Sequence, residues 1–330
     1  MIEDKVNLLV KNSNNLENVK SSFLAGVFKK CNALTLTLKG LEADVYQINN
    51  CIDIIKTNSG VLSNFRGNNL LTTAVNLSIL DNPEESFNEF IIIYEKLKKH
   101  FYTNEFLVLA SQIIYNYKNE RSVDEIVVDT RKVYDLMKEN HLFLTGQEDI
   151  CSAALIATTC DDLNSTFTDM ERCYSILRKN GFWSGNNLQA LTHILSLFGG
   201  TAEEKCNKMI LLNNVLKRSN THIDGYSLPI LGVVALTTSD YDKFSKDLES
   251  VNKVLKKQHG FGNFSLGSSL RNIISASLIC VDSLESDKDS LSYKIIETTK
   301  NISLNIVMIM QIAASSAATT ASIAVSTSNS

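Results

Sequence analysis

The stretch Pro83–His100, PEESFNEFIIIYEKLKKH, decides the fold class. Phe87, Phe90, Tyr94 and Leu97 are separated by three or four residues, so a helix would place them on one face, with Glu, Asn and Lys opposite. A proline suits the first helical position, and acidic residues at the start with lysines at the end complement the helix dipole. The stretch therefore predicts an amphipathic helix with one buried face.

The same pattern returns about every 40 residues along the chain. Tyr94, Tyr134 and Tyr174 follow one another at steps of 40. The turns before the repeats align on Phe65, Phe101, Leu142, Phe182, His222 and Phe261, with steps of 36, 41, 40, 40 and 39. A constant period of this size is typical of stacked helical hairpins.

An apolar segment rich in small residues comes before each amphipathic one, so we expect it to form a buried inner helix. These segments are Leu70–Leu80, Phe106–Tyr115, Ile150–Thr159, Leu188–Phe198, Leu228–Leu236 and Leu270–Val281. Only two prolines and 14 glycines occur, which also favours helices. The predicted fold is all-α, with hairpins forming either an open α/α superhelix or a closed α/α toroid.

Helix starts are predicted from capping boxes. These pair Asn82 with Glu85, Ser122 with Glu125, Thr201 with Glu204 and Ser239 with Asp242. For the third amphipathic helix the start is open between Asp162 and Thr168.

Three regions are expected: an N-terminal helix at 1–21, the hairpin array at 22–300 and an uncharged Ala/Ser/Thr-rich end at 301–330. Within the last region, Leu304–Val325 is long enough to span a bilayer, but Asn305, Gln311 and many hydroxyls interrupt it. A capping helix that frays is the favoured interpretation, and a weak membrane anchor is the alternative.

Charge and cysteine usage limit the partners and the compartment. The formal net charge is -4, from 32 basic and 36 acidic residues, so no nucleic-acid partner is expected. Seven cysteines without a C-x-x-C pair are typical of reduced, buried thiols. The start of the chain has no apolar run of the signal-peptide kind. We therefore predict a cytoplasmic protein.

Common catalytic motifs are missing from the sequence. It has no G-x-S-x-G elbow, phosphate-binding loop, H-E-x-x-H helix, EF-hand or dinucleotide fingerprint. His100, His141, His222 and His259 occupy equivalent repeat positions, which stacking would hold too far apart to share one ion. No metal and no cofactor are predicted, and enzymatic activity is left undecided.

The turns between repeats combine aromatic residues with glycine and asparagine. Stacking would bring them to one rim, where exposed aromatics could anchor a partner; the alternative is that each aromatic fills the gap between hairpins. His193 stands apart as a histidine within an apolar helix with no acidic partner visible in the sequence. The candidate ligand- or partner-binding residues are Arg66, Tyr102, Glu148, Trp183, His193, Tyr226 and Arg271.

The Ser63-Asn64-Phe65-Arg66-Gly67 turn, the Tyr-x-x-Leu-Lys-Lys helix ends and the Ala/Ser-rich C-terminus resemble an uncharacterised family of Gram-positive bacterial proteins of about this length. The turn Gly181-Phe182-Trp183-Ser184-Gly185 is similar to repeat turns of α/α-toroid enzymes of the terpenoid-cyclase and prenyltransferase type. The zinc ligands and the D-x-D-D motif of those enzymes have no counterpart here.

Two functions follow as hypotheses. The leading one is a non-catalytic interaction protein that holds a protein or peptide on a helical-repeat surface. The alternative is an α/α-toroid enzyme or small-ligand-binding protein, with Arg66, Glu148, His193 and Arg271 reaching a central cavity.

Overall fold

The computed structural model describes residues 2–20, 26–221, 225–286, 299–303 and 306. Every regular element in this part of the chain is a helix, including the short 3-10 helices Leu16–Asn18 and Gly225–Ser227. The all-α prediction is therefore confirmed.

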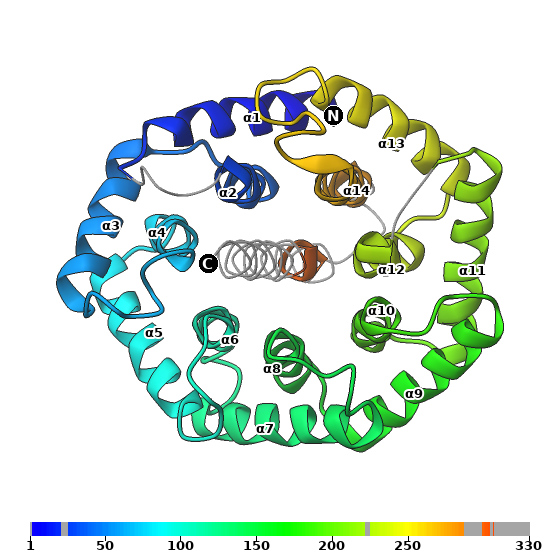
Figure 1. Ribbon diagram of the computed structural model, residues 1–330, viewed down its shortest axis with the longest axis horizontal. Coiled ribbons are helices and arrows are strands. Elements are labelled where there is room, and N and C mark those ends of the chain that lie inside the picture. The colour runs from blue at the N-terminus through cyan, green and yellow to red at the C-terminus, as the bar shows by residue number, and fades with distance from the viewer. Residues whose placement is uncertain (1, 21–25, 222–224, 287–298, 304–305, 307–330) are drawn as a thin grey trace, which may run out of the picture.

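The helices form two concentric layers around one axis (Figure 1). The outer layer consists of α1 (Ile2–Asn15), α3 (Val45–Asn58), α5 (Pro83–Leu97), α7 (Val123–Asn140), α9 (Leu163–Lys179), α11 (Ala202–Arg218) and α13 (Tyr241–Leu255). The inner layer consists of α2 (Gly26–Leu38), α4 (Asn69–Ser78), α6 (Phe106–Tyr115), α8 (Asp149–Thr159), α10 (Asn186–Ser196), α12 (Leu228–Thr237) and α14 (Gly267–Ser286). The apolar segments of the sequence are thus the inner helices.

Neighbouring inner helices run in the same direction. At the starts of α4 and α6, Asn69 donates to the carbonyl of Glu105 at 3.0 Å; toward their ends, Asn76 donates to Gln112 at 2.6 Å. The start of α8 is likewise next to the start of α6, since the Cys151 thiol donates to the carbonyl of Phe106 at 3.4 Å. Because all inner helices begin at the same end of the molecule, the loops that precede them gather there (Figure 1).

We call these loops the loop rim. Its described parts are residues 59–68, 101–105, 141–148, 181–185, 225–227 and 259–266. Outer helices begin beside the opposite ends of the inner helices: Tyr241 of α13 donates to Ala235 of α12 at 2.8 Å, and Ser86 of α5 is 2.9 Å from the Tyr115 hydroxyl at the end of α6.

The two ends of the array meet. The N-terminal helix α1, which the sequence set apart from the repeats, lies in the outer layer and contacts both α2 and α14. Lys30 of α2 is buried, pairs with Glu17 at 3.0 Å and lies 5.7 Å from the ring centre of Phe261. Gly260 leaves room for it, because a Cβ there would lie 2.5 Å from the lysine Cε. These contacts close the layers into a ring.

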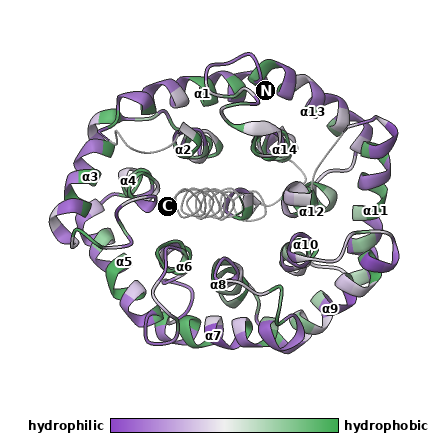
Figure 2. Ribbon diagram, viewed as in Figure 1, coloured by the Kyte–Doolittle hydropathy of each residue, from purple (hydrophilic) through white to green (hydrophobic). Residues whose placement is uncertain are grey.

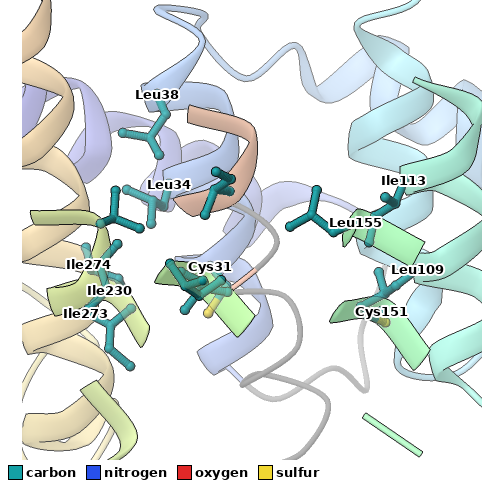
Figure 3. Packing of buried hydrophobic residues seen from close by; sticks show 14 of the residues in the cluster. Cys31, Leu34, Leu38, Leu109, Ile113, Cys151, Leu155, Ile230, Ile273 and Ile274 are labelled. Atoms are coloured by element: carbon teal, nitrogen blue, oxygen red, sulfur yellow. The ribbon is translucent and has the colours of Figure 1, made fainter. Parts of the chain in front are cut away.

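The hydrophobic core lies between the layers and inside the inner ring. Hydrophilic residues follow the outer helices (Figure 2). In Figure 3, Leu34 of α2 lies toward Ile274 of α14, and Leu109 of α6 lies beside Cys151 of α8. The segment 299–303 lies at the centre of the ring (Figure 1), where Ile302 is fully buried. Chain from the C-terminal region therefore occupies the ring centre.

The predicted helix starts are partly right. Thr201 and Glu204 form the predicted capping box, and Asp162 caps α9 by accepting from the amides of Asn164 and Ser165. The prediction for Ser239 is wrong, because Asp240 caps α13 instead. Asn82 and Ser122 precede α5 and α7, but neither side chain accepts a capping hydrogen bond, so these two capping boxes are wrong as well.

Within the described residues, no helix is both long enough and apolar enough to cross a membrane. The candidate anchor Leu304–Val325 falls outside those residues except for Ile306, and His222 and Asp224 of the fifth turn also fall outside them.

Candidate functional site

The loop rim carries aromatic side chains with two distinct roles, often in adjacent residues. Phe101 is 7% exposed while Tyr102 is 92% exposed, and Phe182 is 7% exposed while Trp183 is 90% exposed. Gly181, with a φ of 84°, lets the chain turn from α9 into this second pair. The turn aromatics are therefore of two kinds: some fill the gap between hairpins, and others are exposed to solvent.

The buried aromatics join each loop to the next outer helix. Phe65 contacts Tyr94 of α5 with ring centres 5.2 Å apart, and Phe101 contacts Tyr134 of α7 at 5.3 Å. In the third repeat His141 takes this place, 4.5 Å from the ring of Tyr174. Aligning that turn on Leu142 was wrong by one residue, since Leu142 is exposed. The tyrosines spaced by 40 thus sit in equivalent surroundings.

The exposed members form a set around one end of the ring. Six loops each contribute a large apolar side chain to solvent: Leu62, Tyr102, Phe143, Trp183, Tyr226 and Phe264. Large apolar groups gathered on one surface are typical of an interaction site.

Two predicted site arginines hold the rim loops in place. Arg66 donates to the carbonyl of Lys56 and, at 2.6 Å, to that of Ser59, so it caps the end of α3. Arg271 is buried and donates to the Phe261 carbonyl at 3.0 Å and to Asn263 at 2.9 Å. The Arg66 guanidinium is therefore bonded to the end of α3 and the loop after it, and the Arg271 guanidinium is bonded to the loop at 259–266.

Amide side chains also fix the geometry of the loops at 59–68 and 101–105. Asn64 donates to the Tyr94 hydroxyl at 3.0 Å, Asn68 lies 3.3 Å from the Glu105 carboxylate, and Asn104 accepts from the Phe106 amide at 2.9 Å. These bonds hold the exposed aromatics on an ordered frame.

His193 and Asp149 form a buried pair between α10 and α8. The imidazole Nδ1 lies 3.7 Å from the carboxylate, too far for a hydrogen bond, and neither ring nitrogen has a hydrogen-bond partner among the described residues. Burial lowers the pKa of His193 to about 3 and raises the pKa of Asp149 to about 7, although the Gly146 amide, bonded at 2.8 Å, opposes the second shift. Both groups therefore favour their neutral forms.

One cavity lies beside His193, and a second lies near the ends of α4 and α6. One of about 10 Å³, lined by His193, Ser152 and Ile306, has room for about one water molecule. The other, of about 70 Å³, lies among Lys39, Asn76, Gln112, Asn116 and Asn301. Within the described residues, no three His, Cys, Asp or Glu side chains are grouped as metal ligands.

The seven predicted site residues do not converge on one point. Three of them are exposed on the rim: Tyr102, Trp183 and Tyr226. Arg66 and Arg271 form hydrogen bonds that hold its loops. Glu148 is half-buried beside Gly146, and His193 is buried in the inner layer. Sequence reasoning missed Asp149 as the neighbour of His193. Its position 44 residues earlier, about one repeat, was the available signal. Leu62, Phe143 and Phe264 were missed as exposed residues because nothing in the sequence separates them from the buried members of the same loops.

Comparison with known proteins identifies the family. The model of a family described as "Protein of unknown function (DUF4003)" matches residues 13–313, nearly the whole chain. The chain belongs to the DUF4003 family. The predicted resemblance to an uncharacterised Gram-positive family is therefore confirmed.

This DUF4003 chain is also similar to "Uncharacterized protein YeaA" of Bacillus subtilis (strain 168), with 30% identity over 163 residues. That alignment covers 47% of this chain and 48% of the relative, so the chain spans about half the length of the relative it matches. No solved structure gives a significant match.

Proposed function

We propose that this DUF4003 protein is a non-catalytic interaction protein that docks a protein partner on the loop rim. The observation that carries the proposal is the set of exposed apolar side chains, one on each of six successive loops at one end of the ring. Leaving such groups in water gives no folding benefit, whereas burying aromatic anchors is the main source of affinity in protein interfaces.

The composition of the rim supports a protein partner. Its loops combine Tyr, Trp and Phe with Asn, Ser and Gly, as in 181–185 (GFWSG) and 260–265 (GFGNFS). Antibody binding loops use the same mixture, because rigid aromatics supply contact area and small polar residues supply adaptable hydrogen bonds. The braced loops add preorganisation, which lowers the entropic cost of binding.

Among the described residues, the observation that favours a small-ligand function is the cavity of about 70 Å³ near Asn76 and Asn301, which has a mixed polar and apolar lining. It is smaller than the engineered cavities of about 150 Å³ that accept benzene. The rim is therefore the stronger candidate site.

A photo-crosslinking amino acid placed at Trp183 tests the proposal in the cells that make the protein. Ile92 is the matched control, because it is an exposed apolar residue on the outward face of α5. We expect a discrete protein adduct from position 183 that position 92 does not give. The purified pair should then bind about tenfold or more weakly after Trp183→Ala. Identical adducts from both positions, or an affinity that Trp183→Ala leaves unchanged, would contradict the proposal.

A further inference from the structure

Positive charge surrounds the loop rim, although the whole protein has a formal net charge of -4. Exposed cations lie at the ends of the outer helices, just before the rim loops. Lys99 lies three residues before Tyr102, and Lys179 lies four residues before Trp183. None of the following forms an ion pair among the described residues: Lys99, Lys138, Arg178, Lys179, Lys217, Arg218, Lys256 and Lys257.

In the part of the rim that the structure describes, few acidic groups offset these cations. Glu95 is paired with Lys98 at 2.9 Å, whereas Glu105 accepts only from the neutral amide of Asn68 and keeps its negative charge. Glu139 is exposed and Glu148 is half-buried. The rim therefore keeps an excess of free positive charge.

The inner helices add to this field. Because they are parallel, their positive ends all face the rim, and the starts of α4, α10 and α12 have no side-chain cap. Outer helices instead begin away from the rim with acidic caps, such as Asp44 of α3 and Asp240 of α13. Acidic first turns occur in α5, α7 and α11 as well. Charge is thus separated across the ring.

We infer that the loop rim binds an acidic protein segment in which carboxylates flank apolar side chains. The carboxylates would meet the free lysines and arginines while the apolar groups pack on the exposed aromatics, and such complementarity sets both encounter rate and partner choice. An anionic membrane would meet the same charges, but the asparagine and serine side chains of the rim match the hydrogen-bonding groups of a polypeptide. This inference rests on the proposed docking through the rim.

The test uses the full chain and a random copolymer of glutamate and tyrosine as probe. Vesicles of phosphatidylserine and phosphatidylcholine serve as a second probe. The rim variant combines Lys138→Glu, Lys179→Glu and Lys257→Glu. The control variant combines Lys132→Glu, Lys208→Glu and Lys246→Glu, which change the net charge equally on exposed outer-helix positions away from the rim. Circular dichroism establishes that both variants are folded.

We expect the copolymer to bind the native protein, with affinity falling as salt rises, and to bind the rim variant about tenfold more weakly than the control variant. Equal loss in both variants, no binding of the copolymer, or tighter binding to the vesicles would overturn the inference. A Trp183→Ala, Phe264→Ala variant separates the two proposals. If this double variant weakens copolymer binding while charge reversal does not, docking through the rim is supported and the inference of an acidic partner is wrong. If neither change weakens binding, both proposals fall.

Discussion

At the scale of single residues, neighbours in the rim loops differ sharply in burial. Phe101 packs on Tyr134 between two outer helices, and Arg131 lies 5.2 Å from its ring centre. Tyr102, the next residue, extends into solvent. The aromatic pairs are therefore a folding element and a candidate binding element in two adjacent positions.

Substituting the members of such a pair should separate the two roles. Phe101→Ala should lower the free energy of unfolding by about 3–5 kcal/mol, because it empties a buried site. Tyr102→Ala should change it by less than about 0.5 kcal/mol, because the side chain is already in water. Urea denaturation measures both values, and a Tyr102→Ala loss as large as that of Phe101→Ala would show that the tyrosine is structural.

The buried pair of His193 and Asp149 should give opposite pH dependences. Burial raises the pKa of Asp149 from 3.8 to about 7, so its contribution to stability is present at low pH and is lost as pH rises toward 7. Burial lowers the pKa of His193 from 6.5 to about 3, so its contribution is present above pH 6.5 and is lost as pH falls toward 3. Between pH 4 and 6.5 the two effects oppose each other.

In the Asp149→Asn variant only the contribution of His193 depends on pH. The free energy of unfolding of this variant, relative to that of the native protein, should therefore fall on acidification by up to about 1.4 kcal/mol per pH unit. His193→Gln should leave the aspartate effect, with relative stability falling as pH rises. Denaturation curves across this pH range provide the comparison. Parallel pH profiles for the two variants would show that the groups do not titrate as this pair.

At the scale of elements, helix starts differ in how much a side chain contributes. Thr201 and Glu204 satisfy each other's backbone amides at the start of α11, whereas Ser122 makes no such bond at the start of α7. Thr201→Ala should therefore cost about 1 kcal/mol of stability, and Ser122→Ala should cost much less. Thermal denaturation of the two variants is the check, and equal losses would contradict the assignment of caps.

The sequence was sufficient for the helices but not for their closure. Periodic apolar positions and the tyrosines at steps of 40 predicted the hairpins and the inner segments, because burial on one face leaves a local pattern. Contacts such as Lys30 with Phe261, or His193 with Asp149, join residues one or more repeats apart and leave no local pattern. The choice between open superhelix and closed ring depended on such contacts.

The candidate site was predictable only in part, for a related reason. The concentration of aromatics in the turns is visible in the sequence, and the candidate binding residues Tyr102, Trp183 and Tyr226 are exposed. Arg66 and Arg271 were chosen as charged groups reaching a cavity, but a guanidinium satisfies loop carbonyls equally well. Whether such a side chain reaches a cavity or binds a loop carbonyl depends on the conformation of its loop, which cannot be deduced from the sequence.

At the scale of the whole molecule, the parallel inner helices give the ring two different ends, one of which is the loop rim. Six of the repeats add a described loop, an exposed apolar group and a positive helix end to the same side. A surface of this kind combines many weak anchors into one interface, which is why we place the function there.

Trp183 is the only tryptophan of the chain and lies on that surface, so its fluorescence reports the rim directly. Emission and acrylamide quenching should be measured with and without the partner captured at position 183. We predict a water-exposed, readily quenched tryptophan in the free protein, and a blue shift with loss of quenching in the complex. A complex that forms while Trp183 stays equally quenched would contradict docking on the loop rim.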